Sequence, residues 1–389
     1  MLDAVIAHCL PEDHERALLV GRAWLAGDPG GPSIVALRGG ELADLSALAA
    51  TMSELLDRDD AAAAVRAALA SAPAVADLTT ALTNVAAQRA PYLLPPCDLQ
   101  AVKAAGVTFA DSLLERVIEE QIRGDAARAE AVRGEIAAAI GNDLARVKPG
   151  SAEAMRLRAA LIRRGAWSQY LEVGIGPDAE IFTKCPPMAS VGTGMAVGIH
   201  PASTWNNPEP EVVLALNSQG RILGATLGND VNLRDVEGRS ALLLGRAKDN
   251  NGSCAIGPFI RLFDDGFALD DVRRAEVSLT IQGADNFRLE ASSQMAKISR
   301  DPTDLAAQAF AAHQYPDGAM LFTGTMFAPI QDRDAPGMGF THKRGDVVII
   351  RSPRLGGLVN QVDTCDRIPP WQFGSRALMA NLARRGLLR

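Results

Sequence analysis

The stretch Pro208-Glu209-Pro210-Glu211-Val212-Val213-Leu214 decides the fold of this chain. In a β-strand, residues i and i+2 point to the same face, so Glu209 and Glu211 would project side by side. Two carboxylates so close to each other disfavour each other's ionisation. A bound cation relieves that cost, and ligands that are all oxygen suit Mg²⁺, Mn²⁺ or Ca²⁺ rather than Zn²⁺.

The residues that follow predict a β-hairpin returning to the same point. The apolar run 212–216 is typical of a strand, Asn217-Ser218-Gln219-Gly220 of a turn, and 221–227 of the returning strand. Such a hairpin brings Asp230 beside the two glutamates, and the three carboxylates are predicted to bind one divalent cation. The alternative is a pair of surface glutamates on an edge strand and an unrelated loop aspartate.

The whole chain has the composition of an ordinary globular protein: 389 residues, of which 48% are hydrophobic and 22% charged. The net charge of −7 gives no electrostatic footprint for nucleic acid, although a bound metal can still attract an anionic substrate. The five cysteines are scattered without a C-x-x-C pair, which favours a reducing compartment. No signal peptide is evident and no apolar run is long enough to span a membrane. We therefore expect a cytoplasmic protein that binds neither membrane nor nucleic acid.

Changes in composition divide the chain into a small N-terminal α/β domain, 1–100, and a larger second domain, 101–389. In the first, Leu42 to Leu56 is predicted as a helix. Residues 111–165 are rich in Ala, Glu and Arg and predict a helical insert. From about residue 170, short β-type runs alternate with Gly, Pro and Asp turns. The expected fold class is α+β.

An ordered set of short pieces in the second half resembles the fumarylacetoacetate hydrolase superfamily. In chain order they are Phe182-Thr183-Lys184, Pro208-Glu209-Pro210-Glu211, Gly228-Asn229-Asp230-Val231-Asn232-Leu233-Arg234-Asp235, Lys248, Gly257-Pro258, Gly324-Thr325, Lys343-Arg344-Gly345-Asp346-Val347-Val348 and Gly357-Leu358-Val359-Asn360-Gln361-Val362. The resemblance implies a fumarylacetoacetase-like mixed β-roll catalytic domain over 101–389, with 111–165 as a helical lid segment. It also implies a Mg²⁺-type ion held by Glu209, Glu211 and Asp230, and a homodimer or a dimer of dimers.

The chain departs from the hydrolases of that superfamily in the lid segment. The carbon–carbon hydrolases carry a His–Glu pair there that activates water, whereas Ser112 stands at the histidine position here, with Glu115 three residues on. An unassisted serine is a poor general base near neutral pH. This stretch, like Glu180-Ile181-Phe182-Thr183-Lys184, instead resembles the 2-keto-3-deoxy sugar acid dehydratases. That branch implies proton transfer by Glu180 and Lys248, which without the resemblance would be interpreted as solvated surface residues.

The expected function is therefore a metal-dependent lyase: dehydration of a 2-keto-3-deoxy sugar acid, with 2-keto-3-deoxypentonate converted to 2,5-dioxopentanoate. The partner is a small 2-oxo acid. The sequence leaves open which of Glu180 and Lys248 is the base and which the acid, and burial can lower the pKa of the lysine enough for base chemistry. One alternative is a hydrolase of acylpyruvates or diketo acids on the same scaffold, and another is a catalytically inactive binding protein. The predicted substrate contacts are Lys184, Ser112, Arg116 and Thr325.

Overall fold

The predicted hairpin lies at the centre of the fold. The computed structural model describes residues 1–123, 147–163, 167–327 and 329–388. Strand β10 (Pro210–Leu216) pairs antiparallel with β11 (Ile222–Asp230), with Val213 opposite Thr226. Gly220 closes the turn with a φ of +75°, a backbone conformation that glycine adopts without a steric cost. The hairpin predicted from the sequence is confirmed.

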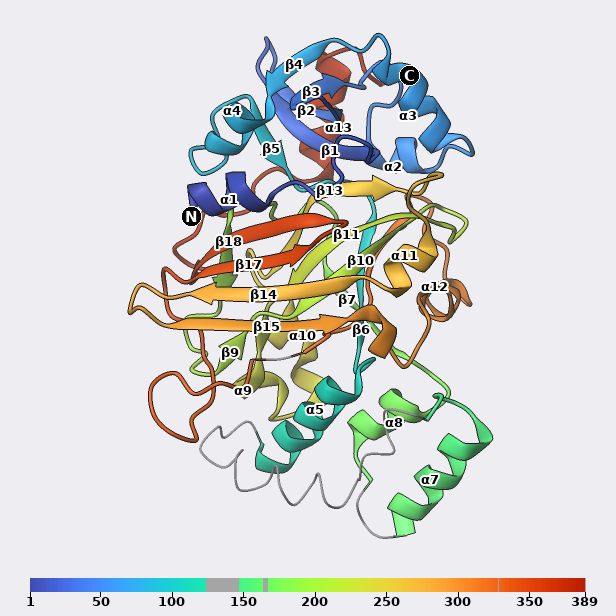
Figure 1. Cartoon of the computed structure of the whole chain (residues 1–389), viewed down its shortest axis with the longest axis vertical. Helices are drawn as coiled ribbons and strands as arrows, with labels where there is room; N and C mark the ends of the chain where they lie inside the picture. The colour runs from blue at the N-terminus through green and yellow to red at the C-terminus, as the bar shows by residue number, and fades with distance from the viewer. Residues whose placement is uncertain (124–146, 164–166, 328, 389) are drawn as a thin grey trace.

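This hairpin belongs to an eleven-stranded mixed sheet that crosses most of the molecule (Figure 1). Its strand order is β4-β3-β2-β1-β13-β11-β10-β16-β6-β7, and β5 pairs with β1. The bounds of the remaining strands are β1 (Leu19–Leu25), β2 (Gly31–Arg38), β3 (Glu41–Asp44), β4 (Ala74–Asp77), β5 (Tyr92–Leu94), β6 (Ala101–Gly106), β7 (Glu180–Cys185), β13 (Cys254–Leu262) and β16 (Ala319–Phe322). The strands before residue 100 thus extend the same sheet, and the boundary at residue 100 stays a prediction.

A second sheet packs against the large one. It has five strands in the order β15 (Arg288–Gln294), β14 (Glu276–Gln282), β17 (Val347–Ser352), β18 (Gly356–Thr364) and β8 (Ala196–Ile199). Leu214 and Leu227 of the hairpin share one buried cluster with Leu279 and Ile350 of this sheet. Burying such side chains between two sheets is the main source of stability for the arrangement. A short pair, β9 (Asn206–Asn207) with β12 (Asn232–Leu233), completes the described strands.

Helices cover the sheets and the two ends of the molecule. The prediction of one helix over 42–56 is wrong, because β3 occupies its start and only α2 (Met52–Leu56) is helical. Strand β3 pairs with β2 across the two-residue turn Gly39-Gly40 and with the more distant β4, and these hydrogen bonds override the helix propensity of the Ala- and Leu-rich stretch. The other helices outside the site are α1 (Leu2–His8), α3 (Ala61–Leu69), α4 (Leu78–Thr83), α11 (Leu269–Arg273), η4 (Met295–Lys297), α12 (Pro302–Phe310) and α13 (Ser375–Arg384).

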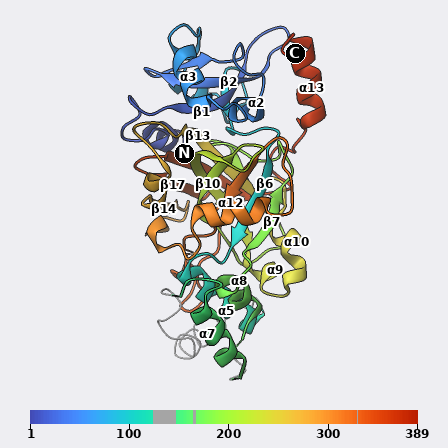
Figure 2. The ribbon, with the colours of Figure 1, turned by 90° about the vertical axis from the view of Figure 1, so that its right-hand side faces the viewer.

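Three helices of the predicted helical segment pack together at one end of the molecule (Figures 1 and 2). They are α5 (Ala110–Ile122), α7 (Ala152–Arg163) and α8 (Gln169–Ile175), and they share a buried cluster that includes Ile118, Leu161 and Leu171. Ser151 caps α7 by accepting a hydrogen bond from the Ala154 amide at 3.1 Å. Residues 124–146 of the predicted segment lie outside the described residues. The α+β fold class is confirmed, and the role of the segment as a lid stays a prediction.

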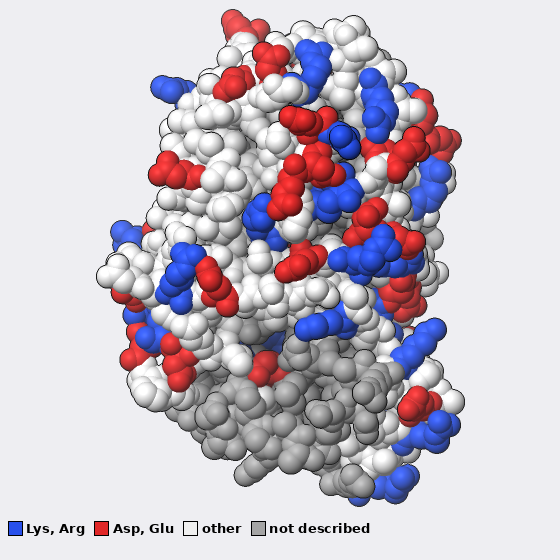
Figure 3. Space-filling model, viewed as in Figure 1, with Lys and Arg blue, Asp and Glu red and all other residues white. Residues whose placement is uncertain are grey.

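The described surface carries both signs of charge. On the face drawn in Figure 3, acidic and basic side chains are interspersed over the described residues. Among those residues, no helix has the length and apolar character needed to cross a membrane.

Candidate active site

Three carboxylates meet at the end of the central hairpin. Glu209 immediately precedes β10, Glu211 lies within it, and Asp230 is the last residue of β11. The Asp230 amide donates to the Glu209 carbonyl at 3.0 Å, and this hydrogen bond holds the two ends of the hairpin together. One oxygen from each carboxylate lies within 4.8 Å of the others, and all three side chains are buried. A buried, all-oxygen donor set fits a hard divalent cation such as Mg²⁺.

Basic side chains surround this carboxylate cluster. The Lys248 ammonium, at the end of α10 (Leu244–Lys248), lies 2.6 Å from Glu209 Oε2 and 3.1 Å from Asp230 Oδ2. Lys184 on β7 lies 2.7 Å from Asp230 Oδ1, and Arg116 on α5 forms an ion pair with Glu209. Buried charges are tolerated when they are paired in this way.

These pairs decide the protonation states. Burial alone would raise the pKa of Glu209, but the charges of Arg116 and Lys248 lower it to about 2. Burial would lower the pKa of Lys248, yet Asp230 and Glu209 raise it well above its ordinary value. The expectation of a lysine with a lowered pKa is therefore wrong for this arrangement, because two carboxylates contact its ammonium.

Glu211 has the opposite electrostatic environment. Burial, followed by the charges of Asp230 and Glu209, raises its pKa well above the ordinary value. The Gly324 amide donates to its Oε2 at 2.6 Å, and the Thr325 hydroxyl lies 3.3 Å from its Oε1 and donates to Glu209 Oε2 at 2.7 Å. A cation at the cluster would offset the repulsion that Glu211 experiences, which agrees with the fit of the donor set.

Glu180, the first residue of β7, faces the same pocket from another strand. It lies opposite Gly106 of β6, and a Cβ on that glycine would come within 1.9 Å of Glu180 Oε2. Burial and the charge of Glu237 raise the pKa of Glu180 to about 7, although Arg116 and Lys248 act to lower it. Its carboxyl group can therefore both accept and donate a proton near neutral pH.

Glu237, the last residue of α9 (Arg234–Glu237), also belongs to the site and is not among the residues predicted from the sequence. It is buried, lines the pocket and lies 3.0 Å from Arg116 Nη1. One turn earlier, Arg234 pairs with Glu115 of α5 at 3.0 Å, and its guanidinium lies 4.2 Å from the centre of the Trp205 ring. The sequence carries one weak signal for this helix. Arg234 and Glu237 are three residues apart, a spacing that places both side chains on one face of a helix.

The structure brings most of the predicted site residues to one pocket. Its lining includes Glu180, Lys248, Glu209, Asp230, Arg116 and Thr325. Glu211 contacts Thr325 and lies buried beside the pocket. Lys184 does not reach the pocket wall in this arrangement: it is completely buried, and its ammonium also donates to the Val231 carbonyl at 3.1 Å. The Ser112 side chain lies outside the described residues.

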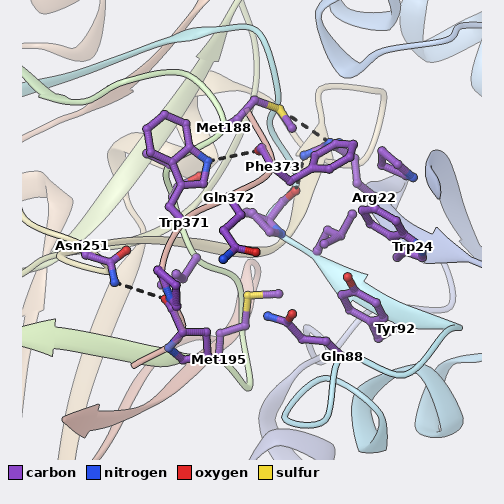
Figure 4. Close-up of a pocket in the computed structure, with 18 residues that line it drawn as sticks. Arg22, Trp24, Gln88, Tyr92, Met188, Met195, Asn251, Trp371, Gln372 and Phe373 are labelled. Carbon is purple, nitrogen blue, oxygen red and sulfur yellow. Dashed lines mark hydrogen bonds between the residues drawn. The ribbon is translucent and has the colours of Figure 1, made fainter. Parts of the chain in front are cut away.

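A second cavity, of about 550 Å³, lies between the N-terminal strands and the segment before α13 (Figure 4). Its walls include the aromatic rings of Trp24, Tyr92, Trp371 and Phe373. None of the predicted site residues lines it, so the candidate chemistry is confined to the carboxylate pocket.

Residues 195–363 match the family model described as fumarylacetoacetate (FAA) hydrolase C-terminal. This matched part of the chain holds the hairpin and all three carboxylates.

Two curated relatives match about half of the chain. A probable 2-keto-3-deoxyxylonate dehydratase of Haloferax volcanii is 31% identical over 195 residues, which are 50% of this chain and 64% of that protein. The 2-dehydro-3-deoxy-D-arabinonate dehydratase of Saccharolobus solfataricus is 32% identical over 183 residues, 47% of this chain and 58% of that protein. The chain thus aligns with less than two thirds of the length of either relative.

A solved structure shows that the fold extends beyond these alignments. The structure of 2-keto-3-deoxy-D-arabinonate dehydratase complexed with magnesium and 2,5-dioxopentanoate superposes with a TM-score of 0.55 at 20% identity. The superposition covers 89% of this chain and 98% of that chain. At this identity the likeness shows the shared fold.

Proposed function

We propose that this chain is a metal-dependent dehydratase of 2-keto-3-deoxy sugar acids, which converts 2-keto-3-deoxypentonate to 2,5-dioxopentanoate and water. The observation that carries the proposal is a single pocket in which Glu180, with a pKa of about 7, and Lys248 face the carboxylates Glu209 and Asp230. The names of both curated relatives support the substrate class. The magnesium and product named for the solved structure support the cofactor and the reaction.

Glu209, Glu211 and Asp230 would hold the divalent cation, in keeping with their buried all-oxygen donor set. Bound there, Mg²⁺ supplies Lewis-acid polarisation of the 2-oxo carboxylate of the substrate. The Thr325 hydroxyl and the Gly324 amide keep the two glutamates in place through hydrogen bonds.

Glu180 and Lys248 would carry the proton transfers. In its ionised form, Glu180 accepts a proton from C3 of the substrate, and a pKa near 7 leaves a large fraction ionised at neutral pH. Lys248, kept as an ammonium by its carboxylate partners, donates toward the hydroxyl group that leaves C4 as water. Loss of water leaves a double bond between C3 and C4. Loss of a proton from C5 and return of a proton to C3 move this double bond to C4 and C5 as an enol, which becomes the aldehyde of 2,5-dioxopentanoate when a proton is added at C4. This scheme needs no activated water, which agrees with Ser112 in place of a histidine.

Arg116 and Thr325 line the same pocket and are proposed substrate contacts, as is Ser112 on the strength of the resemblance alone. Lys184 does not line the pocket, but its ammonium contacts Asp230 Oδ1, and it is proposed to orient that carboxylate. We further propose a cytoplasmic homodimer that acts in pentose breakdown. The free cysteines, Cys9, Cys97, Cys185, Cys254 and Cys365, support the reducing compartment, and light scattering of the purified protein tests the dimer.

A coupled assay tests the reaction. The purified protein is incubated with Mg²⁺ and 2-keto-3-deoxypentonate, and formation of the semialdehyde is followed with an NAD(P)-linked dehydrogenase. We expect product with the wild-type chain and none after removal of the metal with a chelator. Release of pyruvate from an acylpyruvate, without dehydration of the pentonate, would replace the dehydratase by the hydrolase alternative. Inactivity in both assays with full metal binding would favour a binding protein.

A further inference from the structure

Glu237 is a buried acid to which the proposed chemistry gives no metal-binding or proton-transfer role. Only 4% of its surface is exposed, although glutamate is among the residues least often found inside proteins. It lies in the wall of the carboxylate pocket, at the end of α9, with its Oε2 3.0 Å from Arg116 Nη1. A buried carboxylate kept at this place calls for an account of what it does there.

Arg116 joins Glu237 to the metal-site candidate Glu209. One terminal nitrogen of its guanidinium, Nη1, pairs with Glu237, and the other, Nη2, pairs with Glu209 Oε1. The planar guanidinium presents several donors in a fixed fork, so it can bridge two carboxylates at once. The two glutamates therefore share one positive charge.

A second ion pair joins helices α5 and α9, which carry Arg116 and Glu237. Arg234, at the start of α9, pairs with Glu115, the neighbour of Arg116 on α5. The Arg234 guanidinium also lies over the Trp205 ring. The Arg234–Glu115 pair joins α5 and α9 without Arg116. The Arg116 guanidinium can therefore move toward Glu237 and away from Glu209 while the two helices stay in contact.

We propose that Glu237 is a positioning residue that draws Arg116 away from Glu209 when a divalent cation binds, and thereby sets the metal affinity of the carboxylate cluster. The proposal rests on the metal site assigned under the proposed function. A cation ligated by Glu209 competes with Arg116 for the same carboxylate and repels the guanidinium across a short, buried distance. Glu237 offers that guanidinium a second carboxylate already in contact, so it lowers the cost of exchanging one cation for another at Glu209.

A double-mutant cycle on metal binding tests this coupling. Isothermal titration of MgCl₂ into the chelator-treated full-length protein measures Kd for the wild type, Glu237→Gln, Arg116→Gln and the double variant. We expect Glu237→Gln to raise Kd about tenfold when Arg116 is present, a coupling of ordinary size between interacting sites. In the Arg116→Gln background the same change should have a much smaller effect, because no guanidinium remains to be drawn away.

Two variants in the same pocket separate this effect from a general change of charge. Glu180→Gln removes one acid from the same pocket wall, and Arg234→Gln removes one base from the same pair of helices. The Kd change on Glu180→Gln should depend on Arg116 less than the change on Glu237→Gln does, because Arg116 contacts Glu237 at 3.0 Å and acts on Glu180 through its charge. Arg234→Gln should tighten metal binding less than Arg116→Gln. If Glu237→Gln changes Kd equally in both Arg116 backgrounds, the proposal is wrong.

The outcomes of this test distinguish a misfolded variant, a wrong metal site and a wrong role for Glu237. Arg116→Gln alone should bind metal more tightly than the wild type, and a gain of affinity does not result from misfolding. If the wild-type protein binds no divalent cation, the assigned metal site fails as well. If it binds metal and dehydrates the pentonate but the cycle shows no coupling, only the role of Glu237 fails.

Discussion

At the scale of single residues, Glu180 depends on its neighbours for its proposed role. Burial and the charge of Glu237 place its pKa at about 7, and the absence of a side chain at Gly106 leaves room for its carboxylate. An isolated glutamate has a pKa near 4.3 and would be a much weaker base. The chemistry of this position is thus a property of strands β6 and β7 together.

The rate should follow the ionisation of Glu180. Since the ionised form accepts the C3 proton, kcat/KM is expected to rise with pH and to level off above a pKa of about 7. Glu180→Gln should lower kcat by about 10²–10⁴-fold while metal still binds. Initial rates between pH 5.5 and 8.5, with metal content measured in parallel, check both statements. A variant that retains full activity would remove Glu180 from the mechanism.

Gly106 offers a second change at this scale. Its alanine variant would place a methyl group 1.9 Å from the present position of Glu180 Oε2, so the carboxylate must move by an ångström or more. Because misplacing a catalytic group by about 1 Å can cost 10²-fold in rate, we expect kcat/KM to fall by about that factor. Gly245→Ala is the control, since nothing lies within 4 Å of a Cβ there. An unchanged rate for Gly106→Ala would contradict the placement of Glu180.

At the scale of elements, the central hairpin was predictable, whereas strand β3 and helix α9 were missed. The hairpin of β10 and β11 follows from alternating strand-forming residues around a Gly turn, all within about twenty residues. Strand β3 was missed although the two-residue turn Gly39-Gly40 joins it to β2, because the Ala- and Leu-rich residues that follow favour a helix; its other partner, β4, is distant in sequence. Helix α9 was missed because it is only four residues long, too short for a periodic signal. Glu237 was missed together with this helix, because its position near Arg116 depends on how α5 packs.

The packing of α1 on β18 makes a separate prediction about stability. A Cβ on Gly357 would lie 2.6 Å from the His8 carbonyl oxygen, so helix α1 can approach β18 only where glycine leaves space. Gly357→Ala should destabilise the protein by about 1–3 kcal/mol, as overpacking usually does. Chemical denaturation measures this loss, and hydrogen exchange should show opening of α1. The rate per folded molecule should be unchanged, since neither element contributes a residue to the carboxylate pocket.

At the scale of the whole molecule, metal binding should be visible in the thermal stability. A ligand that binds only the folded state at 100 times its Kd stabilises that state by about 2.7 kcal/mol. Saturating Mg²⁺ should therefore raise Tm, and Glu209→Gln or Asp230→Asn should abolish the increase. Glu290→Gln changes an exposed glutamate on β15 and should retain it. An equal increase in all four proteins would show that Mg²⁺ stabilises them at some other place.

The order of strands places residues 1–100 along one edge of the strands that carry the carboxylate site. Strand β1 borders β13, and β13 borders the strand that ends in Asp230. A fragment starting at residue 101 would leave the backbone of β13 without its β1 partner at Ile260 and Arg261, next to the apolar side chain of Phe259. An open apolar edge of this kind recruits strands from other molecules and leads to aggregation. The N-terminal segment therefore covers this edge of β13 and keeps it from pairing with strands of other molecules.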